Sequence, residues 1–450
     1  MEFPANVIYF TLILIILLGY PNQSSYSANI NDSWVKPDNY QTNNTIPTLN
    51  RISCHNSDNN RENEISIHSN SYYNEQESSM GSKNHTLSLS DNIKTVNPEL
   101  SSSGNNVYVV WEEGSYGKSF IVLRKSNDSG ASFSPPLPIT NSGNTNTTAT
   151  ATATDYSVHP DVAASGNSVY IVWKDSDSGI YFKKSDDRGK TFGSNSIKLN
   201  EEHSNGSNVR QGTISDLHIS ASGNLVYIVW KDSNSGIYFK KSNDRGATYG
   251  PLTILTNNTN VSHVKIMPSG NSVHIVWQDT IAGNYSIFYK RSLDGARSFD
   301  SVVKLDGPNE DSYEPEISTQ SNNVFIVWKS ANAGILFRAS IDNGASFLPP
   351  VILSNATNVS DLRISSSDNY VSLVWKGSSI ILRSSTIKGL TFGNEIDVST
   401  TVMLNLFGAS QIDVSSAVRE GIYLVWSQPE VSLKDESRSS YSDILYVRLR

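Results

Sequence analysis

Short runs of apolar residues that end in tryptophan recur along most of the chain. They read VYVVW, VYIVW, VHIVW, VFIVW, VSLVW or IYLVW, and they end at Trp111, Trp173, Trp230, Trp277, Trp328, Trp375 and Trp426. A second short run follows most of them, as in GIYFKK at 179–184 and at 236–241. Gly, Asn and Ser bound these runs, and helix-type spacing is nearly absent after the first twenty residues. The pattern predicts short β-strands and an all-β chain.

The spacing of the tryptophans, 47 to 62 residues, defines a structural repeat. Each repeat has room for four strands, and a period near fifty residues favours a β-propeller over a sandwich. Seven repeats predict seven four-stranded blades over residues 85–450, with each tryptophan packed between neighbouring sheets.

The two ends of this region complement each other. The last repeat stops after the apolar run 443–449, so it lacks a fourth strand, whereas TLSLS at 86–90 precedes the first strand of the first repeat. We therefore expect the 86–90 strand to join the C-terminal blade and close the ring, which leaves no open sheet edge.

A turn of the form S-x-D-x-G-x-[ST]-aromatic follows the strand after the tryptophan run. Full copies occupy 126–133, 185–192, 242–249 and 340–347. The copy at 292–299 has its glycine one place early, and the copy at 385–392 has Ile387 in place of the aspartate. In such a turn the carboxylate and hydroxyl bind backbone groups, glycine adopts a left-handed conformation, and the aromatic ring fills the space between sheets. We therefore assign structural roles to Asp128, Gly130, Asp187, Gly189, Asp244, Gly246, Asp294, Asp342 and Gly344.

These turns resemble the Asp-box, or BNR, repeat of the sialidase superfamily, which other propellers also contain. The resemblance covers about residues 86–450 and implies a propeller. Family enzymes bind a carboxylated sugar with three arginines, the first on the first inner strand, and add a Tyr nucleophile with a Glu partner and an Asp acid/base. Here the first inner strand reads VNPEL at 96–100, and only Arg363 lies on any inner strand. The sequence therefore assigns no sialidase triad.

A ligand site, if present, is expected where loops enter the inner strands and where the chain leaves each tryptophan. These two sets of loops share one face of a propeller. The candidate residues of this rim are His159, Asp161, Asp216, His263, Tyr313, Glu314, Glu316, Asp361, Arg363, Lys174 and Lys231. Paired carboxylates there are suited to acid/base hydrolysis or to binding hydroxyl-rich glycans. The alternative is a hydrated polar rim without function.

Composition narrows the class of partner. The formal charge is −8 and no basic run occurs, which argues against nucleic-acid binding. Cys54 is the only cysteine, so no intrachain disulfide can form. No Cys/His cluster suited to zinc occurs. The segments 175–179 and 232–236 resemble the start of a calcium loop but lack the glutamate that completes one, so we interpret them as polar turns and expect neither a metal nor a cofactor.

The N-terminus indicates export. The run VIYFTLILIILL at 7–18 has the length of a signal-peptide core, with small residues following at 25–28. Residues 1–28 are interpreted as a signal peptide or, alternatively, a membrane anchor. Residues 29–84, rich in Asn and Ser, are interpreted as a flexible low-complexity stalk. N-x-S/T sequons, such as those at Asn127 and Asn260, are compatible with an extracellular or cell-surface glycoprotein.

The leading functional hypothesis is a non-catalytic extracellular propeller that binds a glycan, a surface polymer or a protein partner. The blades holding Trp173 and Trp230 are nearly identical, which suits a repetitive binding surface better than a catalytic funnel. The alternative is a divergent sialidase-like exo-glycosidase, or another polysaccharide hydrolase, with an acidic site. A purely architectural role in a surface layer is a third hypothesis. A cluster of arginines in the funnel would favour the enzyme, whereas a funnel lined by Ser and Asn would favour binding.

Overall fold

The computed structural model describes residues 86–90 and 94–449, apart from 116–117, 141–155, 201–211, 282, 309, 368–369, 387–388, 399–408, 418–420 and 430–441. Three strands nearer the N-terminus are also described: β1 (Tyr26–Asn29), β2 (Ile52–Asn56) and β3 (Asn63–Ile65), which form a sheet of their own. Internal contacts divide the chain into Met1–Gly81 and Ser82–Arg450. Most of the predicted export segment (1–28) and most of the predicted stalk lie outside the described residues.

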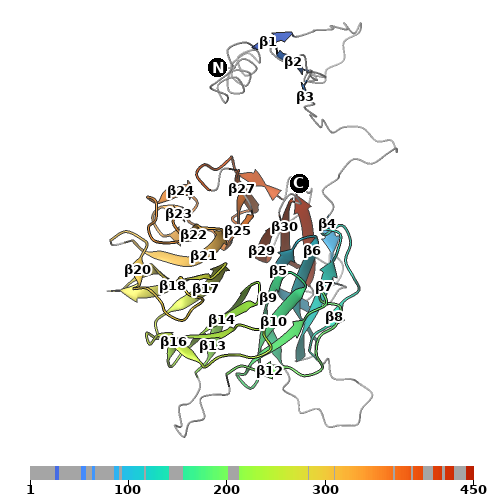
Figure 1. Ribbon diagram of the computed structural model, residues 1–450, viewed down its shortest axis with the longest axis vertical. Coiled ribbons are helices and arrows are strands. Elements are labelled where there is room, and N and C mark those ends of the chain that lie inside the picture. The colour runs from blue at the N-terminus through green and yellow to red at the C-terminus, as the bar shows by residue number, and fades with distance from the viewer. Residues whose placement is uncertain are drawn as a thin grey trace. The chain divides into compact units, whose positions relative to one another are not determined.

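The second unit is a seven-bladed β-propeller, as predicted. Its four-stranded sheets stand around a central axis (Figure 1). Blade 1 comprises β5 (Lys94–Ser103), β6 (Asn106–Ser115), β7 (Lys118–Ser126) and β8 (Leu137–Pro138). Blade 2 comprises β9 (Ser157–Ser165), β10 (Ser168–Asp175), β11 (Ile180–Ser185) and β12 (Ile197–Lys198). Blade 3 comprises β13 (Ile214–Ser222), β14 (Leu225–Asp232), β15 (Gly236–Ser242) and β16 (Thr253–Thr256).

The remaining blades repeat this order. Blade 4 comprises β17 (Ser262–Ser269), β18 (Ser272–Ile281), β19 (Asn284–Ser292) and β20 (Val303–Lys304). Blade 5 comprises β21 (Ser312–Gln320), β22 (Asn323–Ser330), β23 (Gly334–Ser340) and β24 (Val351–Ser354). Blade 6 comprises β25 (Ser360–Ser367), β26 (Tyr370–Lys376), β27 (Ile380–Ser385) and β28 (Ile396–Asp397). Blade 7 comprises β29 (Ser410–Ala417), β30 (Gly421–Pro429), β31 (Ser442–Leu449) and β4 (Thr86–Ser88).

Strand β4 closes the ring, which confirms the prediction from the two chain ends. It pairs antiparallel with β31, and Leu87 lies opposite Tyr446. Leu89, two residues after Leu87, is 1% exposed, and its backbone N–H donates to the carbonyl oxygen of Ile444 at 2.7 Å. The first strand of the region therefore supplies the outer strand of the last blade.

The tryptophans lie in the core between blades, as predicted. Trp173 of blade 2 belongs to a buried cluster that includes Val110 and Ile121 of blade 1. Its indole also stacks on Tyr181 of the same blade, with the ring centroids 6.1 Å apart. Repetition of this contact in successive blades buries each sheet against the next.

The S-x-D-x-G turns hold one hydrogen-bond pattern. In blade 1 the hydroxyl of Ser126 donates to Asp128 at 2.6 Å and accepts from the N–H of Gly130 at 2.8 Å, while Ser132 donates its N–H and its hydroxyl to Asp128. The aromatic residue of the turn, Phe133, packs edge-on against Tyr446 of blade 7, with centroids 4.8 Å apart. Each such aromatic ring therefore fills the space beside the preceding blade, as expected.

Displacement of the glycine in blade 4 does not change this turn. Gly295 has φ of 70° and Ala296 has φ of 60°, so an alanine occupies the place that glycine holds elsewhere. The N–H of Ala296 still donates to Ser292 at 2.9 Å, and Ser298 still donates its hydroxyl to Asp294 at 2.6 Å. The hydrogen bonds of the Asp and Ser side chains therefore hold the conformation without glycine at that position.

The turns also define one face of the propeller. The N–H of Ser129 donates to Asn105 at 2.8 Å, and the N–H of Arg188 donates to Asn167 at 2.8 Å. Both acceptors lie in the hairpin turn that joins an inner strand to the tryptophan strand. We call this face the hairpin face, and we call the opposite face, where the inner strands begin, the entry face.

Candidate functional site

Every inner strand carries a β-bulge at the same place. The ladder to the tryptophan strand shifts register there, and the first residue of the bulge has φ between 50° and 56° in every blade. These seven residues are Asn97, His159, Asp216, His263, Glu314, Asp361 and Gln411. A positive φ costs conformational energy in residues other than glycine, and none of these seven residues is glycine. All seven are polar.

Two residues after each bulge, the strands contribute one polar side chain each to a ring around the axis. Each of these residues lies opposite the valine that precedes the repeated tryptophan. The ring consists of Glu99, Asp161, His218, Lys265, Glu316, Arg363 and Asp413. All seven side chains are titratable, and one comes from each blade. We call this set the charged ring.

Two aspartates of the charged ring hold neighbouring blades together. Asp161 accepts hydrogen bonds from the N–H of Val162 at 2.7 Å and from the N–H of Ile219, in the next blade, at 2.8 Å. Asp413 accepts from Val414 at 2.8 Å and from Leu100 of blade 1 at 2.7 Å. In both cases the two carboxylate oxygens bind the backbone of two adjacent inner strands.

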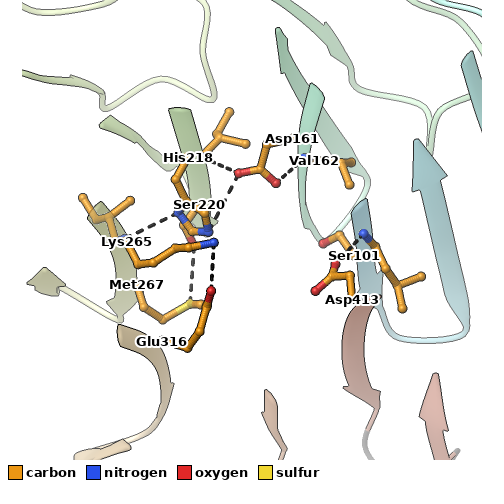
Figure 2. A network of polar contacts seen from close by, with 12 residues as sticks. Ser101, Asp161, Val162, His218, Ser220, Lys265, Met267, Glu316 and Asp413 are labelled. Carbon is orange, nitrogen blue, oxygen red and sulfur yellow. Dashed lines mark hydrogen bonds and ion pairs between the residues drawn. The ribbon is translucent and has the colours of Figure 1, made fainter. Parts of the chain in front are cut away.

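The opposite side of the ring carries both cations. Glu316 accepts from Lys265 and from Arg363, each at 3.2 Å (Figure 2 shows Lys265 and Glu316). The Nε of Arg363 lies 3.7 Å from Asp413 and has no hydrogen bond among the described residues. Burial opposes the charge on Lys265, but Glu316 and the other carboxylates outweigh it, so the pKa of Lys265 is raised. Both cations therefore stay charged.

His218 lies between the two parts of the ring. Its Nδ1 accepts a long hydrogen bond from the N–H of Ile266 at 3.4 Å, and its Nε2 lies 3.8 Å from Asp161 (Figure 2). Burial, together with the positive charges of Lys265 and Arg363, places the pKa of His218 well below its ordinary value. His218 is therefore neutral at physiological pH.

Three neighbouring carboxyl groups, on Asp413, Glu99 and Asp161, complete the ring. Burial raises the pKa of Asp161 to about 7 even though backbone N–H groups and Lys265 oppose the rise. Burial also raises the pKa of Asp413. For Glu99, burial and the charges of Asp413 and Asp161 place the pKa well above its ordinary value. This part of the ring therefore holds protons near neutral pH.

A cavity of about 220 Å³ extends from the charged ring toward the hairpin face. The cavity is lined by the ring residues and by residues that follow them on the inner strands. The positions two residues after the ring form a wall of mostly small side chains, which we call the serine wall: Ser101, Ala163, Ser220, Met267, Ser318, Ser365 and Ser415. Charged groups therefore form one end of the cavity, and hydroxyl groups form most of its sides.

The structure divides the residues predicted for the rim into three groups. Asp161, Glu316 and Arg363 belong to the charged ring and line the cavity. His159, Asp216, His263, Glu314 and Asp361 are bulge residues, which lie on the entry-face side of the ring. Lys174 donates to the carbonyl of Ile214 in the next blade at 3.2 Å, Lys231 occupies the equivalent place in blade 3, and Tyr313 contacts Tyr285 edge-on.

The charged ring also contains residues that the sequence analysis did not propose, namely Glu99, His218, Lys265 and Asp413. The sequence nevertheless contains a pattern that marks these four positions. Aligned on the tryptophans, the inner strands read NPELS, HPDVA, DLHIS, HVKIM, EPEIS, DLRIS and QIDVS, with the ring residue third in each. A polar residue, an apolar residue or proline, a titratable residue, an apolar residue and usually a serine recur in that order.

No group of three or more His, Cys, Asp or Glu side chains within the described part of the chain is arranged to hold a metal ion. Across the same residues, no helix is long and apolar enough to cross a membrane. The apolar run at 7–18 is not among them.

Comparisons with known proteins agree on the fold. No family model matches the chain, and no curated protein matches it. Among solved structures, the polysaccharide lyase Uly1 superposes with a TM-score of 0.51 at 9% identity, over 81% of this chain and 98% of the lyase. YCF48 bound to D1 peptide gives 0.46 at 12% identity, over 82% and 98% of the two chains. The NanB sialidase of Streptococcus pneumoniae gives 0.41 at 11% identity, over 80% and 70%. At these identities the likeness is one of fold alone.

Proposed function

We propose that the protein is a non-catalytic extracellular propeller that binds a hydroxyl-rich ligand, such as one sugar unit of a glycan, in its central cavity. The observation that carries the proposal is the combination of the charged ring with the serine wall. Carboxylates, a guanidinium and hydroxyls together supply the donors and acceptors that sugar hydroxyls require. The volume of about 220 Å³ is below the roughly 300–1,000 Å³ of pockets for drug-sized ligands, so one small unit fits rather than a length of polymer.

The existing contacts of the ring carboxylates favour binding over hydrolysis. Glycosidases generally use two carboxyl groups that are free to exchange protons or attack the sugar. Asp161 and Asp413 each bind two backbone N–H groups, and Glu316 is paired with two cations. Among the described residues that line the cavity, Arg363 is the only arginine, so this lining does not show the cluster of arginines that would favour a sialidase.

One observation favours the second candidate, a divergent glycoside hydrolase. The pKa of Asp161 is raised to about 7, near the value suited to a general acid at neutral pH. In that reading Asp161 donates a proton to the leaving group, and another ring carboxylate completes the pair.

A combined binding and hydrolysis screen of the full chain separates the two candidates. The panel contains neutral, uronic-acid and sialylated glycans, because the lyase of similar fold acts on a polysaccharide. Retention of a glycan class without product release supports the binding propeller. Product release that Asp161→Asn abolishes establishes the hydrolase. Absence of both retention and product release for every glycan of the panel would refute both candidates.

A cavity-filling variant tests whether the ligand occupies the central cavity. Ser220→Leu places a larger side chain in the cavity, where the hydroxyl of Ser220 donates a hydrogen bond to the sulfur of Met267 at 3.5 Å (Figure 2). Ser222→Leu, two residues further along β13 and outside the cavity lining, is the matched control. The proposal predicts loss of binding in the first variant and retention in the second. Equal binding by both would place the ligand elsewhere.

A further inference from the structure

Glu99 differs from the other members of the charged ring in its contacts. Each of the other six makes a hydrogen bond or an ion pair within the ring or to adjacent backbone. Among the residues that the structure describes, no hydrogen bond or ion pair joins the carboxyl group of Glu99. This group lines the cavity and lies between blades 7 and 2, whose ring residues are both aspartates.

The charges around Glu99 favour its neutral form. Asp413 and Asp161, from the two adjacent blades, both raise its pKa, and burial contributes most to the rise. Arg363 and Lys265 oppose the rise, but both are already paired with Glu316, and the pKa of Glu99 remains well above its ordinary value. His218, the remaining titratable group of the ring, is neutral. A carboxyl group that keeps its proton is a hydrogen-bond donor as well as an acceptor.

We propose that Glu99 contacts the ligand of the central cavity and donates a hydrogen bond from its carboxyl group to an uncharged oxygen of that ligand, such as a sugar hydroxyl or ring oxygen. The inference rests on the function proposed above and names the chemistry that the cavity selects. A neutral, hydroxyl-rich ligand satisfies the free donor of Glu99 together with the hydroxyls of the serine wall. A ligand with an ammonium group requires Glu99 to ionise, so its binding would release a proton.

Two variants of Glu99 distinguish a role as hydrogen-bond donor from a role as negative charge. Glu99→Gln keeps a donor of similar shape, whereas Glu99→Leu removes it. With a neutral glycan that the full chain retains at pH 7, we expect the Gln variant to bind within about threefold of the unmodified protein. The Leu variant should bind about 5- to 150-fold more weakly, the range for a buried hydrogen-bonding group left without a partner. Glu395→Gln, at an exposed carboxylate, is the matched control and should change nothing.

Infrared spectroscopy measures the proton on Glu99 without any ligand. The full chain should show a protonated-carboxyl C=O band at pH 7 that is weaker in Glu99→Gln and unchanged in Glu395→Gln. Absence of this difference, or equal loss of glycan binding in the Gln and Leu variants, would overturn the inference while leaving the binding function intact. If the unmodified protein retains no glycan, the proposed function itself fails, and the inference fails with it.

Discussion

Substitution of Gly344 by alanine should destabilise the propeller through one identifiable clash. Gly344 lies in the turn of blade 5 with φ of 77°. A Cβ there would lie 1.8 Å from the hydroxyl oxygen of Tyr289 and 2.8 Å from its Cζ. That hydroxyl is buried and hydrogen-bonded to Nδ1 of His274 at 2.7 Å. The new methyl group must therefore displace a buried ring of blade 4 and disturb its hydrogen bond.

The magnitude follows from two contributions. A left-handed conformation costs a residue with a Cβ about 1–2 kcal/mol relative to glycine. Overpacking of a buried site costs about 1–3 kcal/mol more. The free energy of unfolding should therefore fall by about 2–5 kcal/mol in Gly344→Ala.

A second glycine isolates the steric contribution. Gly270, in the hairpin turn of blade 4, has φ of 58° and nothing within 4 Å of an added Cβ. Gly270→Ala should lose only the backbone contribution of about 1–2 kcal/mol. Urea unfolding followed by tryptophan fluorescence measures both. Tyr289→Phe removes the nearest clashing atom, so Gly344→Ala should cost about 1 kcal/mol less in that background. Equal losses in the two glycine variants, or no relief from Tyr289→Phe, would show that a clash with Tyr289 is not what destabilises Gly344→Ala.

Three further predictions concern the ring, the turns and the closure. The pKa of Glu99 is higher in the folded than in the unfolded protein, so the folded state loses stability as the pH rises above about 4. Relative to the unmodified protein, Glu99→Gln should therefore raise the melting temperature at pH 8 and leave it unchanged at pH 4. Hydrogen bonds from Ser346 and Ser340 lower the pKa of Asp342 to about 2. The ionised carboxylate therefore stabilises the fold above about pH 4, and this stabilisation is lost as the pH falls toward 2. In Asp342→Ala, the free energy of unfolding measured with urea should fall less steeply over that pH interval than in the unmodified protein. Leu89→Ala should lower the free energy of unfolding by about 2–5 kcal/mol, because the side chain of Leu89 is buried at the closing strand. A loss below about 0.5 kcal/mol, which is usual at exposed sites, would show that ring closure does not depend on Leu89.

The sequence predicts the fold well because the fold is encoded locally. Each blade carries its own tryptophan run, and blades 1 to 6 each carry a copy of the turn, complete in blades 1, 2, 3 and 5, so both signals appear within one repeat. Closure by β4 is also predictable, since the missing strand of the last repeat and the extra strand before the first are both visible. The blade 4 turn shows that a displaced glycine does not mark a different structure, because hydrogen bonds from the N–H of Ala296 to Ser292 and from the hydroxyl of Ser298 to Asp294 fix the turn.

The site is harder to predict, for two physical reasons. The bulges at residues such as His159 shift the register, so the side that a residue faces cannot be deduced from simple alternation along the strand. The ring residues also differ chemically from blade to blade, so no repeated residue type marks them. Asp161, Glu316 and Arg363 could be proposed as polar residues on inner strands, whereas the importance of Glu99 depends on its neighbours across two blade interfaces.

A crystal structure of the protein with a glycan that it retains would show directly whether the central cavity is the binding site. We expect density for one intact sugar unit in the central cavity, between the serine wall and the charged ring, with an oxygen of the sugar within hydrogen-bond distance of Glu99. Density on the entry face, or a cleaved sugar in the cavity, would contradict this expectation.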